Sequence, residues 1–281
     1  MSEPSIDLDQ LRDVERRLLE DDALLPSMPE IAVRIQSALE DEAAGVNEIA
    51  TIIQADAALS GRMIQVANSA QFGHLPKVAS VQAAISRLGL KSVRNLAISF
   101  SLKAALLVKK PPYRELLHQV WERSVTVGAV SYILATVTVG LEADRAMLLG
   151  LLHNVGELAV VRIAHDLSLD EAVIERLGRE HGAEVATRVL EHWRLEEFEP
   201  AIQRSGDWMA ASEGEGPDYL DLLQVARYHA LMGTPEGGNL PKLTELPAFS
   251  RFPMLRLGPD MSIELLRESH NKIAEIKALL S

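Results

Sequence analysis

The residues of this chain that could hold a catalytic metal are its eight histidines and its acidic side chains, because the sequence contains no cysteine. Neutral imidazoles and carboxylates that converge from different helices can bind a divalent cation, which activates a water for hydrolysis. His153-Asn154 and His165-Asp166 each place a histidine directly before a second candidate ligand. No two histidines lie four residues apart beside a third ligand, so spacing alone predicts no metal site.

Helices must position these side chains, because apolar residues recur every three to four positions and no stretch alternates as a strand would. Ser27 and Glu30 have the spacing of a capping box, in which a side-chain oxygen precedes a carboxylate by three residues. Asp56 and Ser80 precede two further apolar runs and are candidate N-caps. The sequence therefore predicts an all-α protein.

Prolines and glycines divide the predicted helices into two domains. Lys109-Lys110-Pro111-Pro112 ends a helical run, because proline cannot continue the hydrogen-bonded ladder. We expect an N-terminal helical bundle over 1–110, which includes a leading helix at 1–22. The second domain, 111–281, contains a loop rich in glycine and proline at 233–259. Its predicted helices span 113–138, 143–164, 170–195 and 261–280.

The charge limits the kinds of partner, since 40 acidic and 28 basic residues give a net charge of −12. Nucleic acids and anionic membranes bind clustered lysine and arginine, and Lys109-Lys110 is the adjacent pair that best suits such a patch. We therefore expect no nucleic-acid partner and no membrane insertion. The chain starts with a polar, acidic segment that is unlike a secretory signal, and it has no cysteine, which fits a reducing compartment. The predicted location is the cytoplasm.

Ser124–Leu141 is long enough to raise a second interpretation, because it contains 18 residues without a formal charge. That length approaches a membrane span. Five serine and threonine side chains lie within it, and Arg123 and Glu142 border it directly. A central helix buried by other helices fits these residues better.

Five segments together resemble the HDOD family over about residues 20–230. They are Leu25–Glu30, Asp56–Gly73, Ala84–Leu96, Trp121–Ser124 and Gly150–Leu158. The resemblance implies an N-terminal helical bundle packed on a helical unit related to HD-type phosphohydrolases. It also implies a non-catalytic role in bacterial signalling.

The resemblance further indicates which metal ligands of the related enzymes are replaced in this chain. His153 is kept, but Asn154 stands where an aspartate is expected, and Arg123 stands where the first histidine is expected. An amide brings no negative charge, and an arginine offers only donors and repels a cation. Later positions of the pattern correspond to Gly182, Ser205-Gly206 and Arg227. We therefore predict no catalytic residue, no metal and no cofactor.

The replaced positions predict a vestigial pocket formed by Arg123, His153, Asn154, Glu157 and Arg227. Glu157 stands where the related enzymes often have a lysine, so it would repel a substrate phosphate. It could instead pair with Arg123 or with Arg227, and a buried pair of this kind is sensitive to the loss of either member.

The remaining motif residues have a structural and a functional interpretation. Asn68, Phe72, Gly73, Arg94 and Asn95 either shape helix ends and brace neighbouring helices, which is the favoured interpretation, or contact a partner. His165-Asp166 and His192-Trp193 are expected to lie outside any metal site. Phe249, Phe252 and Met254 either pin the 233–259 segment as a plain surface loop or make it a lid or docking element.

Three functions follow from these observations. The first is a non-enzymatic signalling protein that acts through contacts with a protein partner. The second is a metal-dependent phosphohydrolase with a rearranged site around His153. The third is a sensor of a nucleotide or phosphate, a small-molecule ligand held by Arg123 and Arg227.

Overall fold

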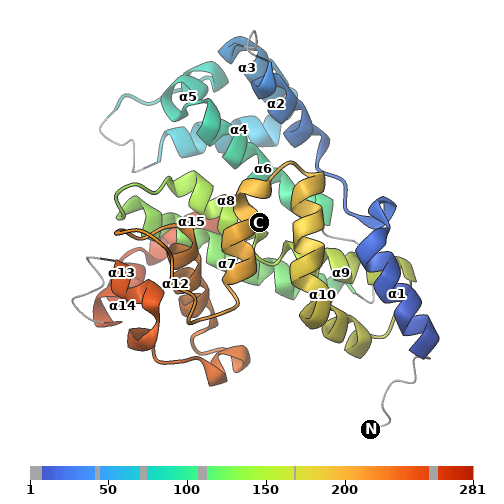
Figure 1. The fold of residues 1–281 in the computed structure, drawn as a ribbon. Helices are drawn as coiled ribbons and strands as arrows, with labels where there is room; N and C mark the ends of the chain where they lie inside the picture. The colour runs from blue at the N-terminus through green and yellow to red at the C-terminus, as the bar shows by residue number, and fades with distance from the viewer. Residues whose placement is uncertain are drawn as a thin grey trace. The chain divides into compact units, whose positions relative to one another are not determined.

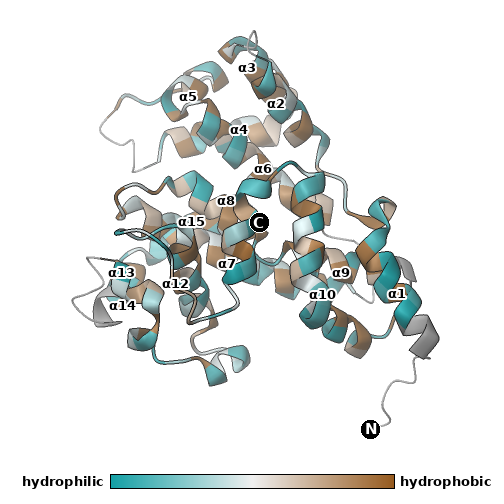
Figure 2. Ribbon diagram, viewed as in Figure 1, coloured by the Kyte–Doolittle hydropathy of each residue, from teal (hydrophilic) through white to brown (hydrophobic). Residues whose placement is uncertain are grey.

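The protein is represented by a computed structural model that describes residues 8–41, 45–69, 75–106, 113–167, 169–252 and 259–280. Within these ranges the regular elements are α-helices and short 3-10 helices, and no strand occurs (Figure 1). The all-α prediction is confirmed. Figure 2 shows hydrophobic residues on some faces of the helices and hydrophilic residues on others, which is the pattern of helices that pack around a core.

The chain divides into two compact units. The N-terminal unit comprises Met28–Ala105 with Leu279–Ser281, and the larger unit comprises Met1–Ser27 with Leu106–Ala278. The described residues 8–27, which we expected in the N-terminal bundle, thus belong to the larger unit. The predicted break at 109–112 lies outside the described residues.

The N-terminal unit is built from amphipathic helices whose apolar side chains form its core, including Ile35, Ile49, Ile53, Met63 and Ile85, each at most 1% exposed. The helices are α2 (Glu30–Glu40), α3 (Val46–Gln54), α4 (Ala57–Ala67), α5 (Val81–Leu88) and α6 (Leu90–Leu106).

Two of the three predicted caps in this unit are confirmed. Asp56 and Ser80 each accept a hydrogen bond from the backbone amide three residues further on, at 2.9 and 3.2 Å. The capping box predicted for Ser27 and Glu30 is wrong. Pro29 is the N-cap of α2 and makes no side-chain cap hydrogen bond, so Glu30 is the first residue of the helix and not its third.

Asn68 connects the end of α4 to the segment that follows it. Its Nδ2 donates to the carbonyl of Val78 at 2.8 Å, and its Oδ1 accepts the amide of the same residue at 2.9 Å. Arg87 donates to the carbonyl of Ala67 at 3.0 Å. These bonds support the structural interpretation of Asn68. Asn95 is buried in α6 and Arg94 is partly buried there, whereas Phe72 and Gly73 lie outside the described residues.

The larger unit contains long helices together with shorter α-helices and 3-10 helices among its described residues. Its long helices are α1 (Leu8–Glu20), α7 (Arg114–Thr136), α8 (Ala143–Leu152), α9 (Val155–Leu167), α10 (Glu171–His192) and α12 (Tyr219–Leu231). The shorter elements are η1 (Asp22–Leu24), η3 (Glu196–Phe198), α11 (Glu199–Arg204), η4 (Pro235–Asn239), η5 (Leu243–Glu245) and α13 (Pro247–Arg251). The chain ends with α14 (Pro259–Glu268) and α15 (His270–Leu280), so the predicted helix at 261–280 is divided at Ser269.

Specific bonds explain why the leading segment belongs to the larger unit. Arg188 of α10 donates to the carbonyl of Leu18 and forms an ion pair with Asp22. Trp193, only 1% exposed, donates its indole N–H to the carbonyl of Pro26 at 2.7 Å. These contacts join residues more than 160 positions apart.

The apolar segment that begins at Ser124 is a buried core helix in this unit. Residues 127–135 of α7 are all buried, and α7 packs against α8, α9 and α12. The preferred interpretation of this segment is therefore confirmed. Among the described residues, the run Ala143–Ala164 is long and apolar enough to cross a membrane, but 78% of its window is buried. Core helices meet the same criterion.

The helix predicted over 143–164 is in fact two helices, which turn at His153 and Asn154. The backbone carbonyl of Asn154 accepts the amide of Leu158 at 3.0 Å and so begins the next helix. The turn places His153 at the C-cap of α8 and Glu157 in the first turn of α9.

Candidate functional site: the vestigial pocket

The five residues predicted to form the vestigial pocket line one cavity of about 230 Å³, which lies within the larger unit. Arg123 comes from α7, Arg227 from α12, and the other three from the turn between α8 and α9 and from the start of α9. The same cavity is lined by Val127, Ala230, Leu231 and Glu236.

A close crossing of α7 and α8 fixes one side of the pocket. A Cβ atom on Gly150 would lie 2.6 Å from the Cα of Gly128 and 2.7 Å from its nitrogen. Side chains larger than hydrogen therefore cannot be accommodated at Gly150 unless the helices separate. This approach sets the distance between Arg123 on α7 and His153 at the end of α8.

A second glycine crossing joins α9 to α10. A Cβ atom on Gly156 would lie 1.8 Å from the carbonyl oxygen of Gly182 and 2.8 Å from the nitrogen of Ala186. Gly182, which corresponds to a lost histidine in the predicted pattern, thus lies at a helix contact and is not among the residues that line the pocket. Glu157 follows Gly156 directly, so the crossing also positions its carboxylate.

Arg123 holds two carboxylates at the pocket. Its Nη2 lies 2.7 Å from Oε1 of Glu157, and its Nη1 lies 3.0 Å from Oε1 of Glu236. Of the two pairings expected for Glu157, the structure shows the one with Arg123. The side chains of Arg123 and Glu157 are each 34% exposed, so this pair is less buried than we expected.

Glu236 is the pocket residue that the sequence analysis missed. It belongs to η4, at the start of the loop rich in glycine and proline that we considered as a lid. Gly237 allows η4 to lie against the end of α12, since a Cβ atom there would lie 2.2 Å from the carbonyl oxygen of Leu231. The later part of the loop is pinned by the buried Phe249 and Phe252. Met254 lies outside the described residues.

Arg227, which also lines the pocket, is anchored by Ser205 and Trp208. Its Nη1 donates to the carbonyl and to the hydroxyl of Ser205, the latter at 3.0 Å. Its guanidinium lies over the ring of Trp208, 5.3 Å from the centroid. Burial lowers the pKa of Arg227 to about 10, although Glu157 acts to raise it. Arg227 remains a cation at neutral pH.

His153 is held as a neutral imidazole. Its Nδ1 lies 2.6 Å from the carbonyl oxygen of Gly150. A carbonyl only accepts, so Nδ1 carries the proton and Nε2 offers a lone pair. Burial, with the charges of Arg227 and Arg123, lowers the pKa of His153 to about 3. Between about pH 6.5 and 3 the unfolded chain therefore binds a proton that the folded chain excludes, so this residue lowers stability as the pH falls.

The pocket residues do not fit a catalytic divalent metal. One imidazole and one amide remain from the ligand pattern, and the carboxylates of Glu157 and Glu236 are engaged by Arg123. A cation bound through His153 would also meet the positive charge of two lining arginines, which is a strong repulsion in a partly buried site. The arrangement is an internal ion-pair network.

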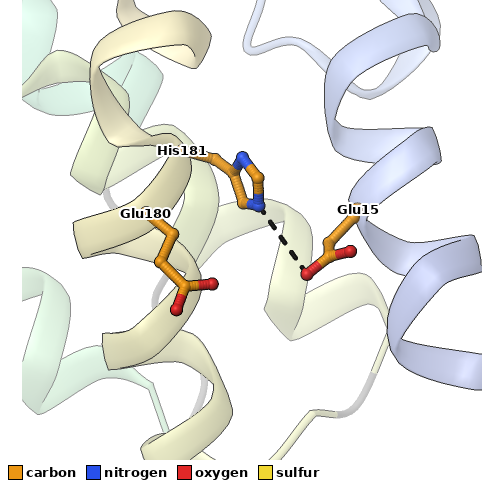
Figure 3. A group of neighbouring side chains, drawn as sticks. All are labelled: Glu15, Glu180 and His181. Atoms are coloured by element: carbon orange, nitrogen blue, oxygen red, sulfur yellow. Dashed lines mark ion pairs between the residues drawn. The ribbon is translucent and has the colours of Figure 1, made fainter. Parts of the chain in front are cut away.

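A second group of possible metal ligands lies in the larger unit, away from the residues of the pocket. The carboxylates of Glu15 and Glu180 and the imidazole of His181 have ligand atoms within 4.8 Å of one another. Figure 3 shows His181 directed at Glu15, and their nearest atoms are 3.7 Å apart. Glu180 is already bound by Arg176 at 2.9 and 3.1 Å. The group is most simply a contact between α1 and α10.

Two further described histidines, His192 and His229, lie outside the pocket lining. His165 and Asp166 belong to α9, and their side chains lie outside the described part of the chain. His192 is exposed at the end of α10, beside the buried Trp193. His229 on α12 is buried, which lowers its pKa to about 4. Neither His192 nor His229 is among the described residues that line the pocket.

Solved structures share this fold. A crystal structure from Shewanella amazonensis, provisionally described as a metal-dependent phosphohydrolase, is 26% identical in sequence. It matches with a TM-score of 0.75 over 97% of this chain and 98% of its own. An HDOD domain protein of unknown function from Geobacter sulfurreducens matches with a TM-score of 0.62 at 22% identity, over 98% of each chain.

The sequence comparisons identify the family. An uncharacterized protein of Treponema pallidum is 26% identical over 187 residues, which are 62% of this chain and 36% of that protein. This chain therefore corresponds to about a third of the length of that relative. The HDOD domain profile matches residues 25–204, which is more than half of the chain. The chain belongs to the HDOD domain family.

Proposed function

We propose that this protein is a non-enzymatic regulatory member of the HDOD family, which acts in bacterial signal transduction through contacts with a protein partner. The observation that carries the proposal is the position of Arg123. It lines the same cavity as His153 and Asn154, and it forms ion pairs with Glu157 and Glu236 there. The guanidinium of Arg123 cannot lose its charge at neutral pH. A group that repels a metal cation therefore stands where the resemblance leads us to expect a metal ligand. Among the described residues that line the pocket, both carboxylates, those of Glu157 and Glu236, are already paired with Arg123.

The chemistry of hydrolysis gives a second argument. Phosphoester cleavage by a site of this kind needs a metal-bound water whose pKa is lowered. Without the metal, the groups left are a neutral imidazole, an amide and carboxylates already paired with Arg123. None of these lowers the pKa of a water by itself.

Metal content and hydrolytic activity test the proposal. The full chain, purified without chelator and then loaded with manganese, iron or zinc, is assayed for bound metal and for cleavage of a generic phosphodiester. We expect no turnover in the wild type and no difference in the His153→Ala variant. Metal that is lost in the His181→Ala variant, and kept in His153→Ala, would come from the Glu15–His181 group and leave the proposal intact.

The alternative function is a metal-dependent phosphohydrolase with a rearranged site around His153. It gains support from the similarity to the Shewanella amazonensis protein. Stoichiometric metal that disappears in His153→Ala, together with turnover that disappears in the same variant, would establish this alternative and end the non-enzymatic proposal.

The partner is a protein of a signalling pathway, and we propose a cytoplasmic location for the pair. Chemical crosslinking in a native host, followed by affinity purification and mass spectrometry, identifies the crosslinked peptides on both proteins. A partner crosslinked to the same surface of this chain in independent preparations supports the proposal. Recovery of the chain without any reproducible crosslinked protein would contradict it.

A further inference from the structure

The charges of the vestigial pocket are paired unevenly. Arg123 binds both carboxylates of the lining, at 2.7 and 3.0 Å. Arg227 forms no ion pair with a described residue, although it lines the same cavity and stays charged. A partly buried cation without a carboxylate partner is costly unless an anion joins it.

The donors of Arg227 are only partly used. Both of its hydrogen bonds in the described part of the chain start from Nη1 and end on Ser205. A guanidinium has five N–H donors in a planar fork, and this geometry suits a phosphate or a carboxylate. The remaining donors sit on Nη2 and Nε of a side chain that lines the cavity.

His153 and Asn154 define what else a ligand must offer. The lone pair on Nε2 of His153 accepts a hydrogen bond, so it suits a ligand that carries a hydroxyl beside its anionic oxygens. The amide of Asn154 can donate as well as accept. A cavity of about 230 Å³ lies below the usual range for drug-sized ligands. Hydrogen phosphate or a small phosphate monoester has these properties.

We propose that the vestigial pocket binds a small phosphate-bearing anion through Arg227 and Arg123, and that Glu236 is an internal carboxylate which this anion displaces from Arg123. The inference rests on the proposed function, since an anion can occupy the pocket in this way only if no metal does. It adds an input to the regulatory role: the ligand loosens the bond between Arg123 and η4. The Gly233–Leu240 segment then carries the signal to the surface.

Glu236 is suited to be displaced, whereas Glu157 is not. The side chain of Glu236 is 53% exposed and lies on a short 3-10 helix. Glu157 is less exposed, at 34%, and its backbone is fixed by the Gly156–Gly182 crossing. Loss of the exposed pair costs less than loss of the more buried one. An anion that approaches Arg123 therefore competes with Glu236.

The test measures the affinity of the full chain for inorganic phosphate by isothermal titration, with sodium chloride at equal ionic strength as the reference. We expect saturable binding to the wild type and about two- to fivefold tighter binding to Glu236→Gln, the range for removing an exposed competing ion pair. Glu245→Gln is the matched control. Glu245 on η5 is 55% exposed and pairs with Lys242, the N-cap of that helix, and its loss should leave the affinity unchanged.

Two further measurements identify the site. Arg227→Gln should weaken binding at least tenfold in protein whose circular dichroism matches the wild type, and the Glu236 comparison stands independently if that variant misfolds. Phosphate should also accelerate hydrogen exchange of the backbone amides at residues 237–240, which the displaced η4 would expose to solvent. Binding without such acceleration would contradict the displacement of Glu236.

The outcomes separate this inference from the proposed function. No phosphate-specific binding to the wild type or to Glu236→Gln, in a protein that is metal-free and inert, overturns the inference alone. Equal affinities of Glu236→Gln and Glu245→Gln also overturn it. Phosphate that binds only after metal has bound through His153 overturns both proposals.

Discussion

At the scale of single residues, Arg123 places a permanent positive charge at one corner of the pocket. The structure shows what this cation does: it ties α7 to Glu157 on α9 and to Glu236 on η4. The two ion pairs therefore connect α7, α9 and η4 at the pocket.

Replacing Arg123 by methionine tests this role. Arg123→Met keeps an unbranched apolar stem but leaves Glu157 and Glu236 without their shared cation. We expect the free energy of unfolding to fall by about 1–2 kcal/mol, because two partly exposed pairs contribute up to about 1 kcal/mol each. The loss is smaller than for a fully buried pair, since Arg123 and Glu157 are each about a third exposed. Urea denaturation measures it.

Arg176→Met is the matched control, because Arg176 pairs with Glu180 at 2.9 Å on the surface of one helix. Its loss should cost about 0.5 kcal/mol or less. A double-mutant cycle between Arg123→Met and Glu157→Gln should give a coupling of about 0.5–1 kcal/mol. A coupling of zero would show that the contact adds nothing to stability.

The five residues that were expected to form the pocket do line one cavity. Four of them lie in the segments that resemble the HDOD family, whereas Arg227 was placed only from the later positions of the ligand pattern. Glu236 could not be predicted, since a loop rich in glycine and proline has no periodicity that shows where its side chains point. The one available signal was that this loop directly follows α12, the helix that carries Arg227.

At the scale of elements, two glycine contacts position the pocket. Gly150 brings α8 against α7, and Gly156 brings α9 against α10. Helix periodicity predicted the apolar runs, but it placed a single helix over 143–164. The turn at His153-Asn154 contains no proline, and it goes with the packing of α8 on α7 and α12 and of α9 mainly on α10.

Alanine at these glycines should separate the helices. Gly150→Ala and Gly156→Ala each introduce a Cβ within 2.6 Å or less of backbone atoms. Overpacking of a core typically costs about 1–3 kcal/mol, and rigid backbone neighbours give values at the upper end. Gly61→Ala is the control: Gly61 is exposed in α4, with no atom within 4 Å of the added methyl.

The control should stabilise the protein by about 0.5–1 kcal/mol through the helix propensity of alanine. Thermal melts of the three variants are compared under one condition. If Gly156→Ala melted as high as the wild type, the close contact with Gly182 would not exist in solution. A contact other than the Gly156–Gly182 crossing would then have to hold Glu157 in place.

At the scale of the whole molecule, pattern and composition were sufficient to predict the helical class. They could not assign residues 1–27 to a unit, because the deciding contacts link them to α10 and Trp193 across more than 160 positions. A leading helix next to a helical bundle in sequence was the simpler expectation. Long-range pairs of this kind depend on tertiary packing, which local propensity does not encode.

Deleting residues 1–27 distinguishes the two assignments. The deletion removes Leu18, which is 1% exposed, and the carbonyl that satisfies the buried indole N–H of Trp193. Lost apolar burial of about 2 kcal/mol and an unpaired donor worth about 1 kcal/mol predict a loss near 3 kcal/mol. Asp22→Asn is the control: this carboxylate is 80% exposed, and its loss should cost about 0.5 kcal/mol or less.

Hydrogen exchange gives a second measurement of the deletion variant. Exchange should increase in α10 and the helices packed on it, while α2 to α5 keep their protection. Increased exchange confined to α2 to α5 would return the leading segment to the N-terminal bundle.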